Sequence, residues 1–267
     1  MNNFSVVMVT YDGEYPSRLK ACMLSIVNQT LIPNEVIICL NGDVREDIFC
    51  VIREYMDKLN IILLKNKKST LAENLNIGIE KAKHNIIVRC DSDDISLPER
   101  FEKQVNFLSN SNYDIVGANI IERINLSQRI KSNIKGLVKK NHYSRFFRNP
   151  VNHNACAFKK SSIEKFRYSP GRMEDFILWS KLLNSNYKIF NIDEVMLLAD
   201  ANGLAERRIG KEYRKAEINL FVENFNNNGF YGKFLALCSF LLRYPFRFSI
   251  SIVILKLFYH LSRKKYW

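Results

Sequence analysis

A dense group of carboxylates near position 91 could do chemistry. Asp91, Asp93 and Asp94 follow an apolar run, residues 86–88, and precede a helix start at Leu97, so three carboxylates lie within four residues. Such side chains repel one another, and hard cations such as Mg²⁺ and Mn²⁺ bind oxygen ligands, Mg²⁺ often through one or two carboxylates plus substrate phosphates. The arrangement indicates a metal-bridged diphosphate at the carboxyl end of a strand. The alternative is a solvated acidic turn that caps the following helix.

The elements that must position these carboxylates are indicated by alternating strand and helix signals. Apolar, strand-like runs cover residues 4–10, 35–40, 61–64 and 86–90, and helix signals lie between them at 17–27, 48–56 and 70–83. The last helix begins with a capping box from Thr70 to Glu73. Continuously apolar strands that alternate with helices are typical of a parallel sheet covered on both faces, with ligands beyond the carboxyl ends of the strands. Thr10, Tyr11 and Asn41 fall at such ends, as do the carboxylates, so the pattern predicts one pocket.

The chain is basic, and its positive charge is concentrated near the C-terminus. Among 267 residues there are 40 Lys and Arg against 27 Asp and Glu, a formal net charge of +13. No acidic residue follows Glu223, whereas seven basic residues do, beside two apolar and aromatic segments. This composition is typical of a pair of amphipathic helices on an anionic membrane surface, the alternative being helices packed as ordinary core. Nucleic acid is disfavoured because the aromatic residues lie within aliphatic runs and do not alternate with exposed basic residues.

Cysteine usage and the length of the apolar runs indicate the cellular compartment of the protein. The six cysteines form no CxxC pair and no regular framework, which indicates a reduced, cytosolic protein. The N-terminal residues lack a basic region followed by an apolar stretch, so we expect no signal peptide. No uninterrupted apolar run reaches the roughly 18–20 residues that a spanning helix needs.

Several segments resemble the family 2 inverting glycosyltransferases of the GT-A fold. The segments that carry the resemblance are Val7–Tyr11, Ser25–Thr30, Pro33–Ile38, Leu71–Gly78 and Asp91–Phe101, the last resembling the family's DxD segment. Further segments, Asn149–His153, Met173–Trp179 and Arg207–Gly210, resemble the bacterial branch that assembles repeat units of O-antigen, capsule and exopolysaccharide.

The resemblance implies an α/β protein with the GT-A fold, a mostly parallel nucleotide-binding sheet flanked by helices. We expect a catalytic domain at residues 1–225, with a nucleotide-sugar half at 1–118 and an acceptor half at 119–225. A basic, amphipathic, membrane-associating helical tail is expected at 226–267. The polar and basic segment 119–148 has no assigned role.

Inverting transfer needs a cation for the leaving diphosphate, a base on the opposite face of the sugar, and positioning of both substrates. The resemblance implies Mn²⁺ or Mg²⁺ on Asp93, with Asp91 near the ribose or the water shell of the metal, and Asp94 capping the next helix. The positions implied to surround the nucleotide are Thr10, Tyr11, Asn41 and Asn74. Asn41 departs from the Asp that is common in the family, and the orientation of its amide leaves the identity of the base open.

The resemblance also implies residues on the acceptor side. Asp175 is the candidate general base, although a carboxylate at a helix start is also a routine cap. Glu174 would bind the acceptor sugar or support Asp175. His153 is placed near the acceptor, the alternative being a loop histidine bonded to backbone. Arg207 and Arg208 suit the donor diphosphate or an acceptor pyrophosphate, because guanidinium groups match phosphate oxygens, and their alternative is an exposed basic loop.

Together these features imply a metal-dependent glycosyltransferase that inverts configuration. It would move a hexose, of glucose or galactose type, from a UDP-sugar to a saccharide linked to lipid pyrophosphate in surface polysaccharide assembly, as a peripheral protein on the cytoplasmic face of the bacterial inner membrane. Transfer to a later position of the repeat unit, or from another nucleotide, is the variant within this class. A non-catalytic nucleotide-sugar-binding or scaffold protein of the same fold is the alternative from another class, and intact Asp93 and Asp175 argue against it.

Overall fold

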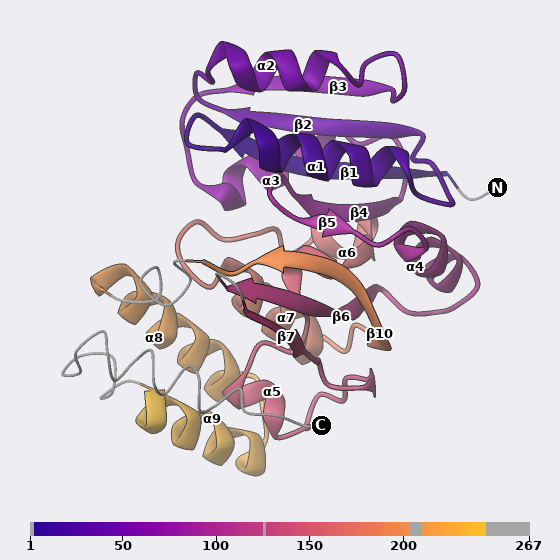
Figure 1. The fold of residues 1–267 in the computed structure, drawn as a ribbon. Helices are drawn as coiled ribbons and strands as arrows, with labels where there is room; N and C mark the ends of the chain where they lie inside the picture. The colour runs from indigo at the N-terminus through magenta and orange to yellow at the C-terminus, as the bar shows by residue number, and fades with distance from the viewer. Residues whose placement is uncertain (1–2, 125–126, 203–209, 244–267) are drawn as a thin grey trace.

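The computed structural model describes residues 3–124, 127–202 and 210–243, which form a ten-stranded sheet with helices on both of its faces (Figure 1). The strands are β1 (Phe4–Tyr11), β2 (Glu35–Asn41), β3 (Ile61–Asn66), β4 (Ile86–Asp91), β5 (Ile95–Ser96), β6 (Ile115–Ile124), β7 (Ser127–Lys131), β8 (Gly136–Leu137), β9 (Ala157–Lys159) and β10 (Ile189–Asp200). The helices are α1 (Pro16–Val27), α2 (Glu46–Arg53), α3 (Leu71–Lys81), α4 (Arg100–Ser109), α5 (Ser144–Phe147), α6 (Lys160–Glu164), α7 (Glu174–Asn184), α8 (Lys211–Asn226) and α9 (Phe230–Arg243), with a 3₁₀ turn η1 (His153–Ala155). The order across the sheet is β3-β2-β1-β4-β9-β6-β10-β5, with β7 beside β6 and β8 beside β10.

The first four strands pair in parallel, as the apolar runs predict. β1 lies between β2 and β4, and β3 pairs with β2. The register places Tyr11 opposite Asn41 and Asn41 opposite Asn66, while Asp91 lies opposite Val9. The carboxyl ends of these strands therefore meet at one edge of the sheet, where the sequence predicts them to meet.

The second half of the sheet is mixed. β9 runs antiparallel to β4 and β6, whereas β10 pairs in parallel with β6. β5, which the sequence analysis did not predict, pairs antiparallel with β10, with Ser96 opposite Leu197. This pairing carries the end of β10 to the turn that holds the carboxylates. The α/β class and the mostly parallel sheet are confirmed.

Two apolar cores lie on the two faces of the sheet. Because side chains alternate across a strand, Met8 packs in the core under α1, α2 and α4, and Val7 packs in the core under α3 and α7. α3 comes close to the sheet at Gly78, where a Cβ atom would lie 2.7 Å from Cγ1 of Val7 and 2.9 Å from Sγ of Cys39. Only a glycine lets the helix backbone approach β1 and β2 this closely.

α8 and α9 lie at the opposite end of the molecule from β3 (Figure 1). Ala216 and Leu220 of α8 pack in a cluster with the first turn of α7. Leu235 and Ala236 of α9 pack in a cluster with Phe146 of α5. The described part of the C-terminal region thus contributes one face to the core of the protein.

A buried arginine in the segment 119–148 ties these helices together. Nη1 of Arg145 donates to Oδ1 of Asn224 at 3.0 Å, and Nη2 donates to Oδ1 of Asn184 and of Asn228, each at 2.9 Å. Nε of Arg145 donates to the carbonyl of Lys140. Burial lowers the pKa of Arg145 to about 10. The basic segment that had no assigned role therefore includes a link between α5 and the ends of α7 and α8.

The expected tail at 226–267 is described as far as residue 243. One face of α9 is buried, and its other face exposes Phe230, Tyr231, Phe234, Leu237, Leu241 and Leu242. Residues 244–267 lie outside the described residues, and the division of the chain at 225 stays a prediction. Among the described helices, none has the length and apolar character needed to cross a membrane.

Candidate active site

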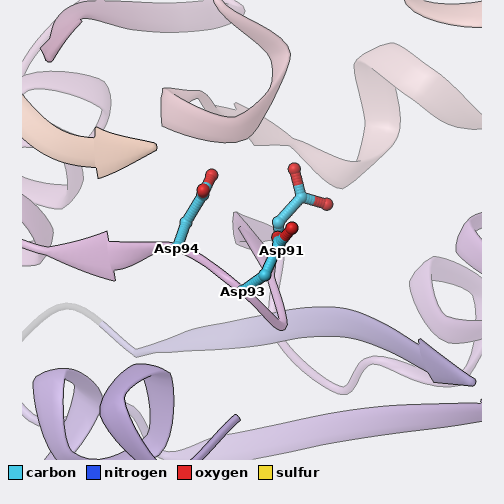
Figure 2. Close-up of side chains that lie close together, drawn as sticks. All are labelled: Asp91, Asp93 and Asp94. Atoms are coloured by element: carbon cyan, nitrogen blue, oxygen red, sulfur yellow. The ribbon is translucent and has the colours of Figure 1, made fainter. Parts of the chain in front are cut away.

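The three predicted carboxylates share one space. Figure 2 shows Asp91, Asp93 and Asp94 rising from the end of β4 and the turn before β5, and their ligand oxygens lie within 4.8 Å of one another. Burial and the charge of Asp91 raise the pKa of Asp93 to about 7. The same two causes raise the pKa of Asp94 well above its ordinary value. Crowded carboxylate oxygens of this kind fit a divalent cation, which would favour their ionised forms.

The expectation that Asp94 caps the next helix is wrong. α4 follows Glu99 and has no side-chain cap. Asp94 is buried, and it accepts hydrogen bonds from Nδ2 of Asn154 at 2.6 Å and from the backbone N–H of Asp200 at 3.1 Å. The β5–β10 pairing brings Asp200 to the carboxylates, and no local sequence pattern indicates that contact. Asp94 therefore joins the carboxylate turn to η1 and to the end of β10.

Two further charged residues beside the carboxylates were missed by sequence reasoning. Arg89 is buried and forms an ion pair with the partly exposed Asp91, and its Nε and Nη1 have no hydrogen-bond partner among the described residues. Burial lowers the pKa of Arg89, but the charge of Asp91 more than offsets this and raises it. On the other side of the turn, Oε2 of Glu14 accepts a hydrogen bond from Oγ of Ser92 at 2.5 Å. The sequence offered one signal for these two residues, the position of Arg89 two residues before Asp91.

The residues expected around the nucleotide differ in exposure. Thr10 is buried, and its Oγ1 has no hydrogen-bond partner among the described residues, whereas Tyr11 is 53% exposed at the end of β1. Asn41 accepts from the backbone N–H of Ser69 at 2.7 Å and donates to the carbonyl of Ser69 at 3.0 Å. These two bonds fix the orientation of the Asn41 amide. An aspartate at this position could not donate to the Ser69 carbonyl.

Asn74 is fully buried and holds the same loop. Its Oδ1 accepts from Asn66 at 2.8 Å, and its Nδ2 donates to Oγ of Ser69 at 2.9 Å and to the carbonyl of Thr70 at 3.0 Å. Asn41 and Asn74 thus both anchor the loop between β3 and α3. Their contact with a nucleotide stays a prediction.

The Glu-Asp pair forms the first turn of α7, after Met173 in the left-handed region at φ 58°. Oδ1 of Asp175 accepts from the N–H of Phe176 at 2.7 Å, and Oδ2 accepts from Nδ2 of Asn149 at 2.5 Å. The N-cap position itself makes no side-chain bond, so Asp175 is not the N-cap. Burial and the charge of Asp175 raise the pKa of Glu174 to about 7, and Asp91 and Arg89 also act on it. This pair is linked to the carboxylates at 91–94 through one short segment, because Asn149 bonds Asp175 and Asn154 bonds Asp94.

His153 is buried between aromatic rings, and among the described residues its ring bonds a tyrosine hydroxyl and no backbone group. Its Nε2 lies 2.9 Å from the hydroxyl of Tyr168, and the ring of Trp179 packs edge-on at 6.1 Å between centroids. Burial and the charge of Arg89 lower the pKa of His153 well below its ordinary value, so the ring is neutral. Its acceptor role stays a prediction, and Arg207 and Arg208 lie outside the described residues.

Comparison with known families decides the relationship of the chain. Residues 5–173 match the model of glycosyl transferase family 2. The chain belongs to this family. The resemblance on which the sequence analysis relied is confirmed, and the carboxylates at 91–94 lie within the matched region.

Curated relatives of this family 2 glycosyltransferase include bacterial enzymes of polysaccharide biosynthesis. It is 31% identical over 230 residues to the amylovoran biosynthesis glycosyltransferase AmsE of Erwinia amylovora, covering 82% of this chain and 84% of that one. It is 32% identical over 221 residues to an Escherichia coli UDP-Gal:alpha-D-GlcNAc-diphosphoundecaprenol beta-1,3-galactosyltransferase, covering 80% of each.

Solved structures show the same fold. S. aureus TarS 1–349 in complex with UDP-GlcNAc aligns with a TM-score of 0.70 at 17% identity, covering 92% of this chain and 73% of that one. The Pyrobaculum calidifontis mannosyltransferase PcManGT, in complex with GDP-Man and Mn²⁺, aligns with a TM-score of 0.60 at 14% identity, covering 99% of this chain and 76% of that one. At these identities the likeness concerns the fold alone.

Proposed function

We propose that this glycosyltransferase is metal-dependent and inverting, and that it transfers a hexose of glucose or galactose type from a UDP-sugar. The acceptor is a saccharide linked to lipid pyrophosphate, and the reaction takes place at the cytoplasmic face of the bacterial inner membrane during surface polysaccharide assembly. The observation that carries the proposal is the carboxylate cluster after β4, which the segment 149–154 links by hydrogen bonds to a second carboxylate pair at the start of α7.

The carboxylates of the two groups have different roles in the reaction. Asp93 would hold Mn²⁺ or Mg²⁺, which when bound neutralises the leaving diphosphate, and Asp91 would contact its water shell or the ribose. Asp175 takes the proton of the acceptor hydroxyl as that oxygen forms a bond to the anomeric carbon. The bond from the anomeric carbon to the diphosphate oxygen breaks, the electron pair leaves with UDP, and the configuration inverts. Glu174 binds the acceptor sugar or supports Asp175.

The donor and acceptor classes rest on the E. coli relative, whose name specifies UDP-Gal and a diphosphate-linked GlcNAc acceptor. Thr10 offers a buried hydroxyl at the end of β1 that has no hydrogen-bond partner in the described part of the chain, and the neighbouring Tyr11 offers an exposed ring, which suits contacts to a nucleotide. Arg207 and Arg208 are proposed for phosphate oxygens, and His153 for the wall of the acceptor site.

Membrane attachment is proposed to use the exposed face of α9. Phe230, Phe234, Leu237 and Leu241 recur at helical spacing, and Phe230 is 90% exposed. The chain after Glu223 has seven basic residues and no acidic one, so its charge suits an anionic leaflet. Such an arrangement would place the protein beside a lipid-linked acceptor.

The catalytic proposal is tested by replacing Asp93 with alanine. We expect the Asp93→Ala variant to lose transfer and the Mn²⁺-dependent part of UDP binding in isothermal titration calorimetry, because the diphosphate loses its bridge. Asp47→Asn, which changes a carboxylate paired with Arg45 at the start of α2, is the control and should retain both. Equal UDP affinity of the wild type with Mn²⁺ and with EDTA would overturn the metal assignment.

Liposome flotation tests the membrane proposal. Full-length protein should float with phosphatidylglycerol vesicles, whereas a Phe234→Asp, Leu241→Asp double variant should float less while keeping its melting temperature. Ile130→Asp, at a side chain that is 63% exposed on β7, is the matched control. Raised salt should weaken attachment without abolishing it, since salt screens only the electrostatic share. Equal flotation of the double variant and the wild type would refute attachment through α9.

A further inference from the structure

The segment 149–154, called the bridging segment below, touches both carboxylate groups of the site. At one end Nδ2 of Asn149 donates to Oδ2 of Asp175 at 2.5 Å. At the other end Nδ2 of Asn154 donates to Oδ2 of Asp94 at 2.6 Å. One short piece of backbone therefore connects the start of α7 to the turn after β4.

The bridging segment is fixed between its ends. Nδ2 of Asn191 on β10 donates to the carbonyl of Pro150 at 2.9 Å, and Nδ2 of Asn152 donates to the carbonyl of Ala118 on β6 at 3.0 Å. The side chain of Val151 is fully buried. Moving the segment would break buried hydrogen bonds and expose apolar surface, both of which are costly. Its two terminal amides are therefore held at a set separation by the sheet beneath them.

We propose that the bridging segment positions the base relative to the donor site, with Asn149 and Asn154 as its two positioning residues. The inference rests on the proposed function, in which Asp175 accepts the proton of the incoming hydroxyl. In-line displacement requires the acceptor oxygen, the anomeric carbon and the leaving oxygen to be aligned, so the base and the diphosphate site must keep a fixed distance. A neutral amide suits this role, because it orients a carboxylate by donating one hydrogen bond and leaves its charge in place.

Three variants of the full-length protein separate the two ends. The assay uses Mn²⁺, UDP-galactose or UDP-glucose, and an alkyl-linked GlcNAc diphosphate as acceptor. Asn149→Leu should lower kcat by about 10²-fold, the size expected for a small misplacement, and leave UDP affinity in Mn²⁺ unchanged. Asn154→Leu should weaken Mn²⁺-dependent UDP binding by about 10- to 100-fold, the size of outer-shell losses at metal sites, because the turn that carries Asp93 loses its anchor at Asp94. Asn152→Ala removes the hydrogen bond to Ala118 in the middle of the bridging segment, and it should both lower kcat and weaken UDP binding.

The matched control removes another Asn–Asp pair. Asp193→Ala deletes the bond from Nδ2 of Asn119 to Asp193, which lies on the order of 20 Å along β10 from Asp200, and keeps the bond from the backbone N–H of Asn133 to Asn119. It should keep both kcat and UDP affinity. Asn149→Ser, which retains a hydroxyl donor, covers the case in which the leucine variant does not fold.

The outcomes distinguish the inference from the proposed function. If the wild type transfers sugar and a folded Asn149→Leu variant retains its kcat, the positioning role is refuted and the function stands. If Asn149→Leu weakens UDP binding as much as it lowers kcat, the separation of the two ends is refuted. A wild type without transfer refutes the proposed function. The inference can then still be tested by UDP binding. It is refuted if Asn154→Leu and Asn152→Ala bind UDP in Mn²⁺ as tightly as the wild type does.

Discussion

Replacing Asp175 with asparagine tests the assignment of the base at constant side-chain volume. The two oxygens of Asp175 accept from Phe176 at 2.7 Å and from Asn149 at 2.5 Å. If the new amide at position 175 keeps its oxygen towards the N–H of Phe176, its NH₂ group faces the NH₂ group of Asn149. Two donors then meet, and no hydrogen bond forms between them. The Asn149 amide can rotate to present its own oxygen, so we expect a loss of stability of about 1 kcal/mol. In a protein of this size that lowers Tm by about 2–4 °C.

The expected kinetic loss is much larger than this structural cost. A missing general base lowers turnover by about 10²- to 10⁴-fold, or about 2.7–5.4 kcal/mol in activation free energy at 1.36 kcal/mol per factor of ten. The assay measures kcat by UDP release and UDP affinity by calorimetry, and affinity should be nearly unchanged. Asp193→Asn is the control, because Asp193 also accepts from an asparagine amide, that of Asn119. An Asp175→Asn variant with kcat within a few-fold of the wild type would refute the assignment.

Three other perturbations test the fold and the charges of the site. Gly78→Ala should destabilise the protein by about 1–3 kcal/mol in denaturant unfolding, because the new methyl group would meet Cys39 at 2.9 Å. Arg145→Met should lower Tm, since the side-chain oxygens of Asn224, Asn228 and Asn184 each lose a donor; a Tm equal to the wild type would refute that link. Burial raises the pKa of Glu174 to about 7, above its ordinary 4.5, so the folded state holds a proton that the unfolded state releases. Stability should therefore fall as pH rises between these values, and Glu174→Gln should remove that part of the Tm–pH curve.

The nucleotide-binding half of the fold could be predicted because its signals are local. Continuous apolar runs give the four parallel strands within one or two residues of their observed ends. The capping box is formed, with Thr70 accepting from the N–H of Glu73 and Glu73 accepting from the N–H of Thr70. Parallel pairing then places the ends of these strands, with Asn41 and Asp91, at one edge.

The rest of the site depends on contacts between distant parts of the chain. Asp94 looks like a helix cap in the sequence, but its partner Asp200 is 106 residues away. Arg89 lies within an apolar run, and only the folded chain shows that its side chain pairs with Asp91. The sequence predicts that Asn41 contacts a base, and the structure shows that its amide makes two hydrogen bonds to the backbone of Ser69. Sequence periodicity indicates which face of an element is buried, but it does not name the partner that a polar side chain will find.

The central claim is tested most directly by a transfer assay with analysis of the product. Purified full-length protein would be incubated with UDP-galactose or UDP-glucose and an alkyl-linked GlcNAc diphosphate, in Mn²⁺ or in EDTA, and the product analysed by nuclear magnetic resonance. We predict transfer in Mn²⁺, none in EDTA, and a β-linked hexose, which is inverted from the α-linked donor. An α-linked product, or equal transfer in EDTA, would contradict the account.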